Sequence, residues 1–583
     1  VQSEKRSLLE LTEIAELTVK ERLQTIQNVS AVDIWGENRY SMRLWLDPVK
    51  MAAYGITPIE VKNAIDRENV ELPSGSIEGD KIELTIRTLG LMETPEEFNN
   101  LVIKEDNYRI VRFGDIGTAE LDSENRKNIL KRNGIPMVST VIIPQPGANQ
   151  IEISDEVALR VEQMQKDLPE DVKVEVVFDN TKFIRASISE VEETIYVAFI
   201  LVIIIIFMFL RDWRVTLIPV VVIPVSLVGS FFIMYLAGFS INVLSMLAVV
   251  LAVGLVVDDA IVVTENIYQK IEQGMKPREA GIEGSKEIFF AVISTTITLV
   301  AVFFPIVFLE GMTGRLFREF SIVVSGAVII SSFVALTFTP MMATKLLKHR
   351  EKQNWFYRKT EPFFDKMNKA YENGLLRFLK HKMVAIPIIA ITVILIFVMW
   401  NAVPAEMAPL EDRSSITVRT SAPEGATYEF VRDYTEKIYD IVDSVAPERE
   451  SNVAIIRSSF GMVRLILPDI DKRERSQMEI ADAVTAAVRG ETEARTFVQQ
   501  QSTFGGRRSG MPVQYVLQAP NIEKLEEFIP LFMEKVNASG KFEMADVNLK
   551  FTKPETRIMI DRDKAALLGV STRDIGQTLQ YAL

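Results

Sequence analysis

The chain has 583 residues, of which 48% are hydrophobic and 25% charged, and its formal net charge at pH 7 is −13. That charge argues against nucleic-acid binding, which needs a basic footprint. The absence of cysteine excludes disulfides, thiolate catalysis and cysteine-ligated metals. With two histidines in the whole sequence, no metal site is expected.

The first polar stretch, 1–193, is predicted to be α+β. Leu11 to Ile26 has helical spacing of its apolar residues, and the runs 31–36 and 40–47 are strand-like. The chain opens Val-Gln-Ser-Glu, with no initiator methionine and no leader of the charged-then-apolar kind. We therefore expect it to be a partial chain, taken from a longer protein.

Six hydrophobic runs follow, each about as long as a helix needs to be to cross a bilayer. An even number of crossings places the two long polar stretches, 1–193 and 404–583, on the same side of the membrane. Of the six runs, only the third contains any charged residue, and its charged residues are aspartates. The runs are about 194–210, 215–236, 241–264, 288–309, 321–344 and 384–403.

Lys and Arg in the short loops predict the orientation. The loops after the first, third and fifth runs hold two, four and eleven of them, against none and two after the second and fourth. The basic loops are therefore predicted to be cytoplasmic, with both polar stretches outside. The most basic loop, 345–383, interleaves aromatic residues and is predicted to be an amphipathic helix bound to membrane lipid. An ordinary solvated linker helix is the alternative.

The second polar stretch repeats part of the first. Arg43-LWLD-PVKMAAYG-ITPIEV aligns without gaps with Arg557-IMID-RDKAALLG-VSTRDI at an offset of 514 (557 minus 43). Within the second copy, 556–561 is predicted to be a strand and 563–568 a helix. A repeat at this distance predicts a protein built in two halves, with about twelve spans in all.

Two adjacent acids, Asp258 and Asp259, interrupt the third run. Each costs on the order of 2.5–3.5 kcal/mol near the bilayer centre, so such side chains are expected to face a protein interior and to carry protons or ions. Burial and a like-charged neighbour favour the protonated acid, whereas a nearby cation favours the ionised one. No Lys or Arg lies within the six runs, so the cation is expected in the second half. The alternative role is a polar contact between helices.

The residues around these acids resemble the signature helix of the resistance-nodulation-division (RND) efflux transporters. The likeness joins the entry Phe239-SINVLSM-Leu247 to the helix Gly254-LVVDDAIVVTEN-Ile267. It extends over essentially the whole chain. Further matching segments are Arg211-DWRVTLIPVVVIPVSLV-Gly229, Thr313-GRLFREF-Ser321 and Phe338-TPMMATKL-Leu347.

The resemblance implies a membrane α-helical bundle, with six spans present of about twelve, and α+β periplasmic porter and docking subdomains. It implies a homotrimer in the bacterial inner membrane that works with a periplasmic adaptor and an outer-membrane channel. The implied divisions are 1–66 and 141–193 (one porter subdomain), 67–140 (docking), 194–344 (five spans), 345–383 (cytoplasmic amphipathic helix), 384–403 (a span), 404–510 (second-half porter) and 511–583 (the start of the next).

The resemblance also implies a function, which is drug/proton antiport of hydrophobic or amphiphilic compounds by a secondary active transporter, not an enzyme. The proton motive force drives it, without a cofactor. Asp258 and Asp259 match the family's proton-relay pair. Metal-exporting members usually replace the second acid, so the pair favours organic substrates. A heavy-metal exporter and a non-transporting scaffold or receptor remain alternatives.

Two aromatic residues match the family's drug pocket in position. Trp35 falls where the family places an aromatic of the deep pocket, although it also fits a strand-end aromatic in a subdomain core. Phe460 lies near the family's pocket-dividing loop. That loop is short here and holds one Phe, which leaves the shape of the pocket open.

Overall fold

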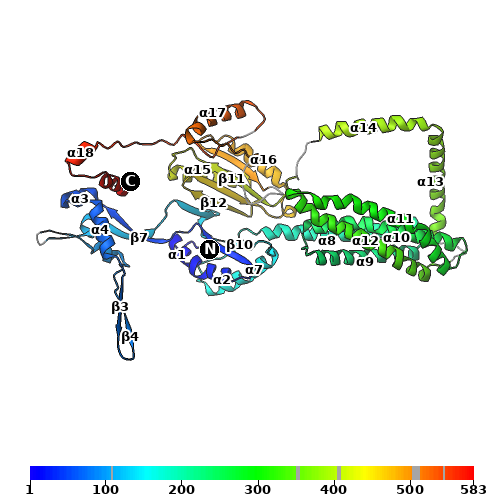
Figure 1. The fold of residues 1–583 in the computed structure, drawn as a ribbon, viewed down its shortest axis with the longest axis horizontal. Helices are drawn as coiled ribbons and strands as arrows, with labels where there is room; N and C mark the ends of the chain where they lie inside the picture. Colours follow the sequence, from blue (N-terminus) through cyan, green and yellow to red (C-terminus); the bar gives the residue numbers. More distant parts are fainter. Residues whose placement is uncertain (107–108, 349–354, 404–408, 502–512, 543–544, 583) are drawn as a thin grey trace. The chain divides into compact units, whose positions relative to one another are not determined.

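The computed structural model describes residues 1–106, 109–348, 355–403, 409–501, 513–542 and 545–582. The chain forms two compact units. The polar unit comprises Val1–Phe178 and Glu406–Leu583, and the membrane unit comprises Asp179–Ala405. Figure 1 follows the chain through both.

The membrane unit contains six helices long and apolar enough to cross a bilayer. Each holds one of the six predicted runs, so that prediction is confirmed. The first helix starts fourteen positions before its apolar run (180 against 194), so the predicted porter boundary at 193 lies inside it. The helices are α8 (Asn180–Leu210), α9 (Trp213–Ala237), α10 (Val243–Glu272), α11 (Pro277–Phe303) with the 3₁₀ turn η2 (Phe304–Phe308), α12 (Gly311–Leu346) and α14 (Ala385–Ala402).

Local sequence signals set the turn before α10. Gly238 ends α9 in the left-handed conformation, with φ of 70°, which costs glycine little. Asn242 then caps α10, because its side chain accepts hydrogen bonds from the backbone N–H groups of Leu244 and Ser245. Its Nδ2 also donates to Glu319 of α12 at 2.6 Å. The entry to the signature helix is therefore fixed by its own residues and by α12.

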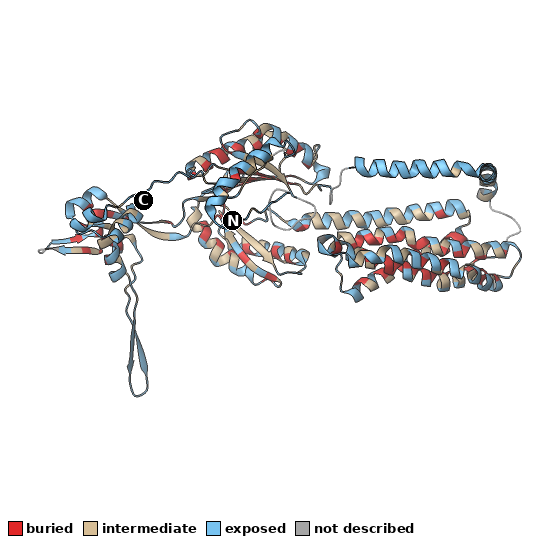
Figure 2. Ribbon diagram, turned by 45° about the horizontal axis from the view of Figure 1, so that its top comes forward, coloured by how far each residue is buried: buried red, intermediate tan, exposed pale blue. Residues whose placement is uncertain are grey.

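The core of the membrane unit lies between α9, α10 and α12. Large shares of these three helices are buried, while α14 has no buried residue, a contrast visible in Figure 2. Ser331 of α12 donates from its buried Oγ to the carbonyl of Val256 at 2.6 Å. Such a bond satisfies a hydroxyl group for which bilayer hydrocarbon offers no partner.

The amphipathic segment forms α13 (Trp355–Lys380) and the 3₁₀ turn η3 (Lys382–Val384); positions 349–354 of the predicted segment lie outside the described residues. Arg211, which ends α8 with φ of 56°, joins α13 to the bundle. Its Nη1 lies 2.5 Å from Glu361, and its guanidinium lies 3.9 Å from the Tyr357 ring centroid. An ion pair and a cation–π contact therefore tie the start of α13 to the end of α8.

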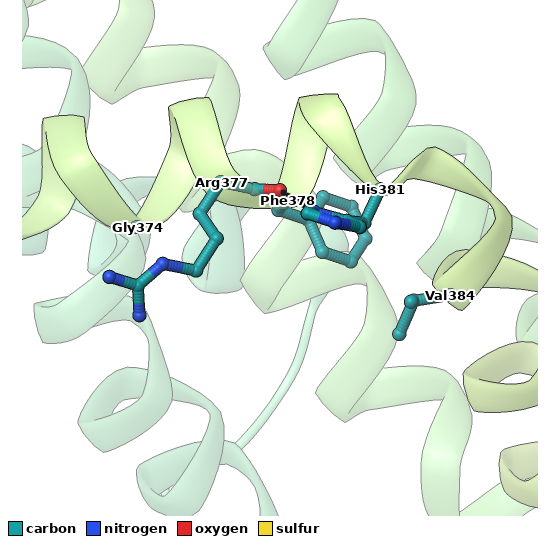
Figure 3. A pocket seen from close by; sticks show the side chains of 5 residues that line it. All are labelled: Gly374, Arg377, Phe378, His381 and Val384. Carbon is teal, nitrogen blue, oxygen red and sulfur yellow. Dashed lines mark hydrogen bonds between the residues drawn. The ribbon is translucent and has the colours of Figure 1, made fainter.

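The other end of α13 borders a surface hollow of about 370 Å³. Figure 3 shows its lining side chains, with the Arg377 guanidinium directed away from the His381 ring. Because these polar groups do not converge, the hollow is a poor binding site. Binding of membrane lipid by α13 stays a prediction. The hollow is lined by Gly374, Arg377, Phe378, His381 and Val384.

The start of the polar unit packs helices on a two-stranded sheet. The predicted helix over 11–26 is confirmed as α1 (Leu8–Ile14), a π-helical turn η1 (Ala15–Lys20) and α2 (Glu21–Gln24). Strand β1 (Val29–Trp35) pairs antiparallel with β10 (Ser139–Pro144). Val19, Leu23 and Val32 share a core with side chains of α7 (Gln150–Asp167).

A second group of elements packs around Phe113 and Ile116, both fully buried. Its core also contains Met51, Val61 and Ala64, so the division predicted between 66 and 67 cuts through α4. The elements are β2 (Tyr40–Leu46), α3 (Pro48–Tyr54), α4 (Pro58–Glu68), α5 (Pro95–Asn99), β5 (Val102–Asp106), β6 (Arg109–Arg112), α6 (Phe113–Ile116) and β7 (Gly117–Ser123), with an exposed hairpin of β3 (Pro73–Glu78) and β4 (Glu83–Arg87).

A six-stranded antiparallel sheet joins distant parts of the sequence. Helices α15 (Tyr428–Val445) and α16 (Gln477–Val488) cover one of its faces. Its last two strands come from the segment predicted to be docking, and Asn133-Gly134 turns between them with φ of 49° and 81°, as a two-residue hairpin requires. The order is β14 (Arg495–Gln500), β11 (Ser415–Ser421), β13 (Phe460–Ile466), β12 (Ser451–Arg457), β8 (Asn128–Arg132) and β9 (Ile135–Pro136).

The sequence repeat reappears as a repeat of helix caps. Asp47 caps α3 and Asp561 caps α18 (Arg562–Leu567), which confirms the predicted second helix. The glycines that follow, Gly55 and Gly569, have φ of 60° and 70°. Thr57 and Ser571, at the next helix starts, exchange hydrogen bonds with the acid three residues on. Helix α19 (Thr572–Ala582) is in contact with its counterpart α4.

The strand predicted over 556–561 is wrong. These residues have no regular structure, whereas β2, their counterpart, pairs with β7 along its whole length. A strand needs a neighbour for its backbone groups, and within the described residues no strand pairs with 556–561. Caps depend on nearby residues only, so they form in both copies.

Candidate functional site

Asp258 and Asp259 lie on the C-terminal half of α10, on the side away from its buried face. That face runs through Ala252, Val256 and Ala260, all 0% exposed. Asp258 is exposed and Asp259 half-buried, as expected for neighbours about 100° apart around a helix. The Asp258 carboxyl group therefore lies on the uncovered surface of the helix, and the Asp259 carboxyl group lies at the border between that surface and the packed core.

The uncovered surface of α10 forms a stripe centred on Asp258. Its members Leu247, Leu251, Gly254, Asp258 and Val262 are spaced three or four residues apart and are all exposed, which places them on one side of the helix. A methyl group added at Gly254 would meet no atom within 4 Å. An acid in a span is too costly to face lipid, so this stripe, named here the open stripe, suits contact with another protein surface.

Thr295 of α11 is the polar neighbour of the acids that sequence reasoning missed. Its Oγ1 lies 3.5 Å from Asp259 Oδ1 and 2.9 Å from the carbonyl of Val292. The shorter bond is to Val292, so the hydroxyl can turn to Asp259 without being held there. The signal was present in the sequence as Ser294-Thr295-Thr296, three hydroxyl residues inside an apolar run.

The last part of the signature motif holds two helices together. Asn266 Nδ2 donates to the carbonyl of Gly284 in α11 at 2.8 Å, and Lys270 pairs with Glu287 at 2.9 Å. The buried side chain of Ile267 also packs closely on Gly284. A Cβ added at Gly284 would lie 3.0 Å from the Ile267 side chain. Asn266 is therefore a packing residue, whereas Glu265, beside it, is exposed.

The two predicted pocket aromatics lie at one sheet. Phe460 begins β13 and stacks with Arg419 of β11, whose guanidinium carbon lies 5.1 Å from the ring centroid. Trp35 ends β1 and is 41% exposed. The next residue, Gly36, is so close to Leu130 of β8 that an added Cβ would come 2.7 Å from the leucine Cβ. The end of β1 therefore reaches the sheet that carries Phe460.

Comparison with known proteins identifies the relatives of this chain. Residues 1–583 match the AcrB/AcrD/AcrF family. An uncharacterized transporter of Haemophilus influenzae is 32% identical over 581 residues, which cover 99% of this chain and 56% of that protein. The chain thus spans about half the length of the curated relative it matches. With six apolar helices and a match along its whole length, it belongs to the AcrB/AcrD/AcrF family of RND permeases, which are multi-pass membrane transporters.

Proposed function

We propose that this protein exports hydrophobic or amphiphilic compounds in exchange for protons. The observation that carries the proposal is the position of Asp258 and Asp259 on α10, one exposed at the centre of the open stripe and one half-buried beside it. Two acids that are so costly in a span need a use. A carboxyl group that alternates between a protein contact and water can take up a proton on one side and release it on the other.

The proposed cycle depends on a cation opposite the open stripe. A second half-bundle, which the 514-residue repeat predicts, would supply a Lys or Arg there. Protonation of Asp258 and Asp259 neutralises the carboxyl groups and removes their attraction to this cation. The two halves then shift, and deprotonation on the cytoplasmic side restores the contact. Gly254, without a side chain, gives the second half-bundle room to approach α10.

The remaining parts of the proposal follow from family membership. The protein acts as a homotrimer in the bacterial inner membrane, with its polar unit in the periplasm. A periplasmic adaptor and an outer-membrane channel complete the path to the outside. The proton motive force supplies the energy and no cofactor takes part. Trp35 and Phe460 border the substrate pocket, which opens and closes as the membrane unit shifts.

Substitution of the acids tests the proton relay. Asp258→Asn and Asp259→Asn, introduced into the gene in its native host, keep the side-chain shape but cannot ionise. We expect export of a fluorescent amphiphile to fall to the level of a deletion strain, with the amount of protein in the membrane unchanged. Glu265→Gln is the matched control, because Glu265 is an exposed acid on the same helix, two turns after Asp258 and beyond the apolar run, and it should export normally. Proton-dependent export by the Asn variants would overturn the relay assignment.

The deletion strain itself tests transport against a scaffold or receptor role. Loss of an exporter raises the steady-state amount of dye in the cells, and collapse of the proton gradient in the parent strain should do the same. Loss of a scaffold leaves dye accumulation unchanged in both comparisons. Equal accumulation in parent and deletion strains would therefore contradict the proposed function for the dyes tested.

A further inference from the structure

The face of the six-stranded sheet opposite α15 and α16 carries cations and no acid. Directly paired residues of antiparallel strands point to the same face, so the register assigns every position. Along β8, β11, β12, β13 and β14, no Asp or Glu occupies a position on this face. It is named here the arginine face, after Arg132, Arg419, Arg457, Arg464 and Arg495.

Acids from neighbouring loops pair with two of these five side chains. Arg132 lies 2.6 Å from Glu175, and Arg495 pairs with Asp546. Across the described residues, no ion pair reaches Arg419, Arg457 or Arg464. Within the described part of the chain, the arginine face therefore holds three positive charges without counter-charges.

Arg464 is the most enclosed of the three. The ring of Phe178 covers its guanidinium, with the central carbon 4.7 Å from the ring centroid. Its Nε is buried and has no hydrogen-bond partner in the described part of the chain. Burial lowers the pKa of this guanidinium, yet arginine stays charged in proteins. A desolvated cation without an acid weakens the fold, so packing alone does not explain Arg464.

Apolar side chains fill the space between the unpaired cations. Met462 lies directly opposite Arg419 on the neighbouring strand, and Phe497 lies opposite it on the other side. Arg464 is the diagonal neighbour of Arg419, which places their Cα atoms about 7–8 Å apart. Phe460 stacks with Arg419. Cationic and apolar groups are therefore mixed within the area of one small molecule.

We propose that the arginine face binds anionic amphiphiles, which are small molecules with an apolar body and a sulfate or carboxylate group. This inference rests on the proposed export function and names its preferred substrate class. The negative group supplies the missing partner of Arg464 or Arg419 through charge-assisted hydrogen bonds. The apolar body lies on Phe460, Met462 and Phe497. An amphiphile with a cationic head finds no acid among the strand positions of this face, and the two acids that reach it from the loops are paired with Arg132 and Arg495.

Two probes with the same tail and opposite heads test the inference. Dodecyl sulfate and dodecyltrimethylammonium share the dodecyl tail, and their head groups carry opposite charges, on a sulfate and on a quaternary ammonium. In the native host, the double variant Arg419→Gln, Arg464→Gln should export dodecyl sulfate about tenfold more slowly, because it loses charged hydrogen bonds, and export the cation at the parental rate or faster. Lys at both positions should restore part of dodecyl sulfate export. Arg432→Gln is the control, since Arg432 lies on α15 and pairs with Asp433 at 2.9 Å.

The outcomes separate this inference from the proposed function. Selective loss of dodecyl sulfate export in the Gln variant, with partial rescue by Lys, supports the anionic preference. If the Gln variant affects both probes equally, or if the parent strain exports the cation but not dodecyl sulfate, the inference is overturned and proton-driven export still stands. If the Asp258→Asn protein exports both probes at the parental rate, the proposed function fails and this inference fails with it.

Discussion

The membrane unit and the polar unit each contain unpaired charges of one sign. In the membrane unit these are Asp258 and Asp259, in runs that contain no Lys or Arg. In the polar unit they are Arg419, Arg457 and Arg464, for which no ion pair is found among the described residues. Neither set is a product of fold stability, because unpaired charges in weakly hydrated surroundings cost free energy. The sign of each set is the basis of the two proposals, that the acids of the membrane unit carry protons and that the arginines of the sheet bind anions.

Elsewhere the polar unit pairs its enclosed charges. The side chain of Arg473 is 0% exposed and forms an ion pair with Asp412. Arg475 makes two hydrogen bonds of 2.7 Å to the carboxylate of Glu448. The polar unit can therefore supply an acid to an enclosed arginine. The lack of such an acid at Arg464 is specific to the arginine face. Three predictions test whether the unpaired charges serve function and the paired charges serve stability.

The largest expected effect follows from giving the acids a permanent cation. Val262 lies one turn after Asp258 on the open stripe and is 45% exposed, so Val262→Lys places an ammonium group beside the carboxylate. Because an adjacent cation favours the ionised acid, proton uptake becomes difficult and export should fall about tenfold or more. Val262→Gln, polar but uncharged, should keep most export. Equal rates for the two variants, at equal protein amounts, would contradict the need for a free carboxylate.

An intermediate effect on stability separates a paired arginine from an unpaired one. Arg473→Gln leaves Asp412 half-buried without its partner, which should cost about 3–5 kcal/mol and lower the melting temperature of the purified protein. Arg464→Gln removes a desolvated charge that has no partner among the described residues, so the melting temperature should stay constant or rise. A similar drop in both variants would show that Arg464 has a structural role.

The smallest effect concerns the pH dependence of the same pair. Burial alone would raise the pKa of Asp412, but hydrogen bonds from Arg473 and from the backbone of Gln477 and Ser414 outweigh it and lower the pKa. A lowered pKa contributes stability above the unfolded value of about 3.9 and loses it as the pH falls through the folded value. Between about pH 5 and about pH 3, the parent should therefore lose more thermal stability than Asp412→Asn. Parallel pH curves would show that Asp412 contributes little.

Local features were predictable from the sequence. The six apolar runs became six helices because bilayer-length hydropathy depends on neighbouring residues alone. The caps at Asp47, Thr57 and Ser571 form for the same reason. The strand expected over 556–561 failed because its counterpart β2 depends on β7, more than seventy residues away. Periodicity shows that a segment can be a strand but does not supply its partner.

The candidate sites divide in the same way. Asp258 and Asp259 could be found from the sequence, since charge inside an apolar run is a local signal. Thr295 could not be assigned, because its approach to Asp259 depends on how α11 packs on α10. The arginines are common residues in unremarkable strands. Only the register makes Arg419 the neighbour of Met462 and Arg464 the neighbour of Val453.

The division into membrane and polar units, the six spans, the helix caps and the pair of acids could all be read from the order of the residues alone. Each of these depends on residues within one helix length of each other. By contrast, the packing of the helices sets which stripe of α10 is left open, and the pairing of the strands sets which side chains share the arginine face. Val453 pairs with Arg132, across more than three hundred residues, and the sign of charge on a surface built by such pairings emerges only when the strands meet.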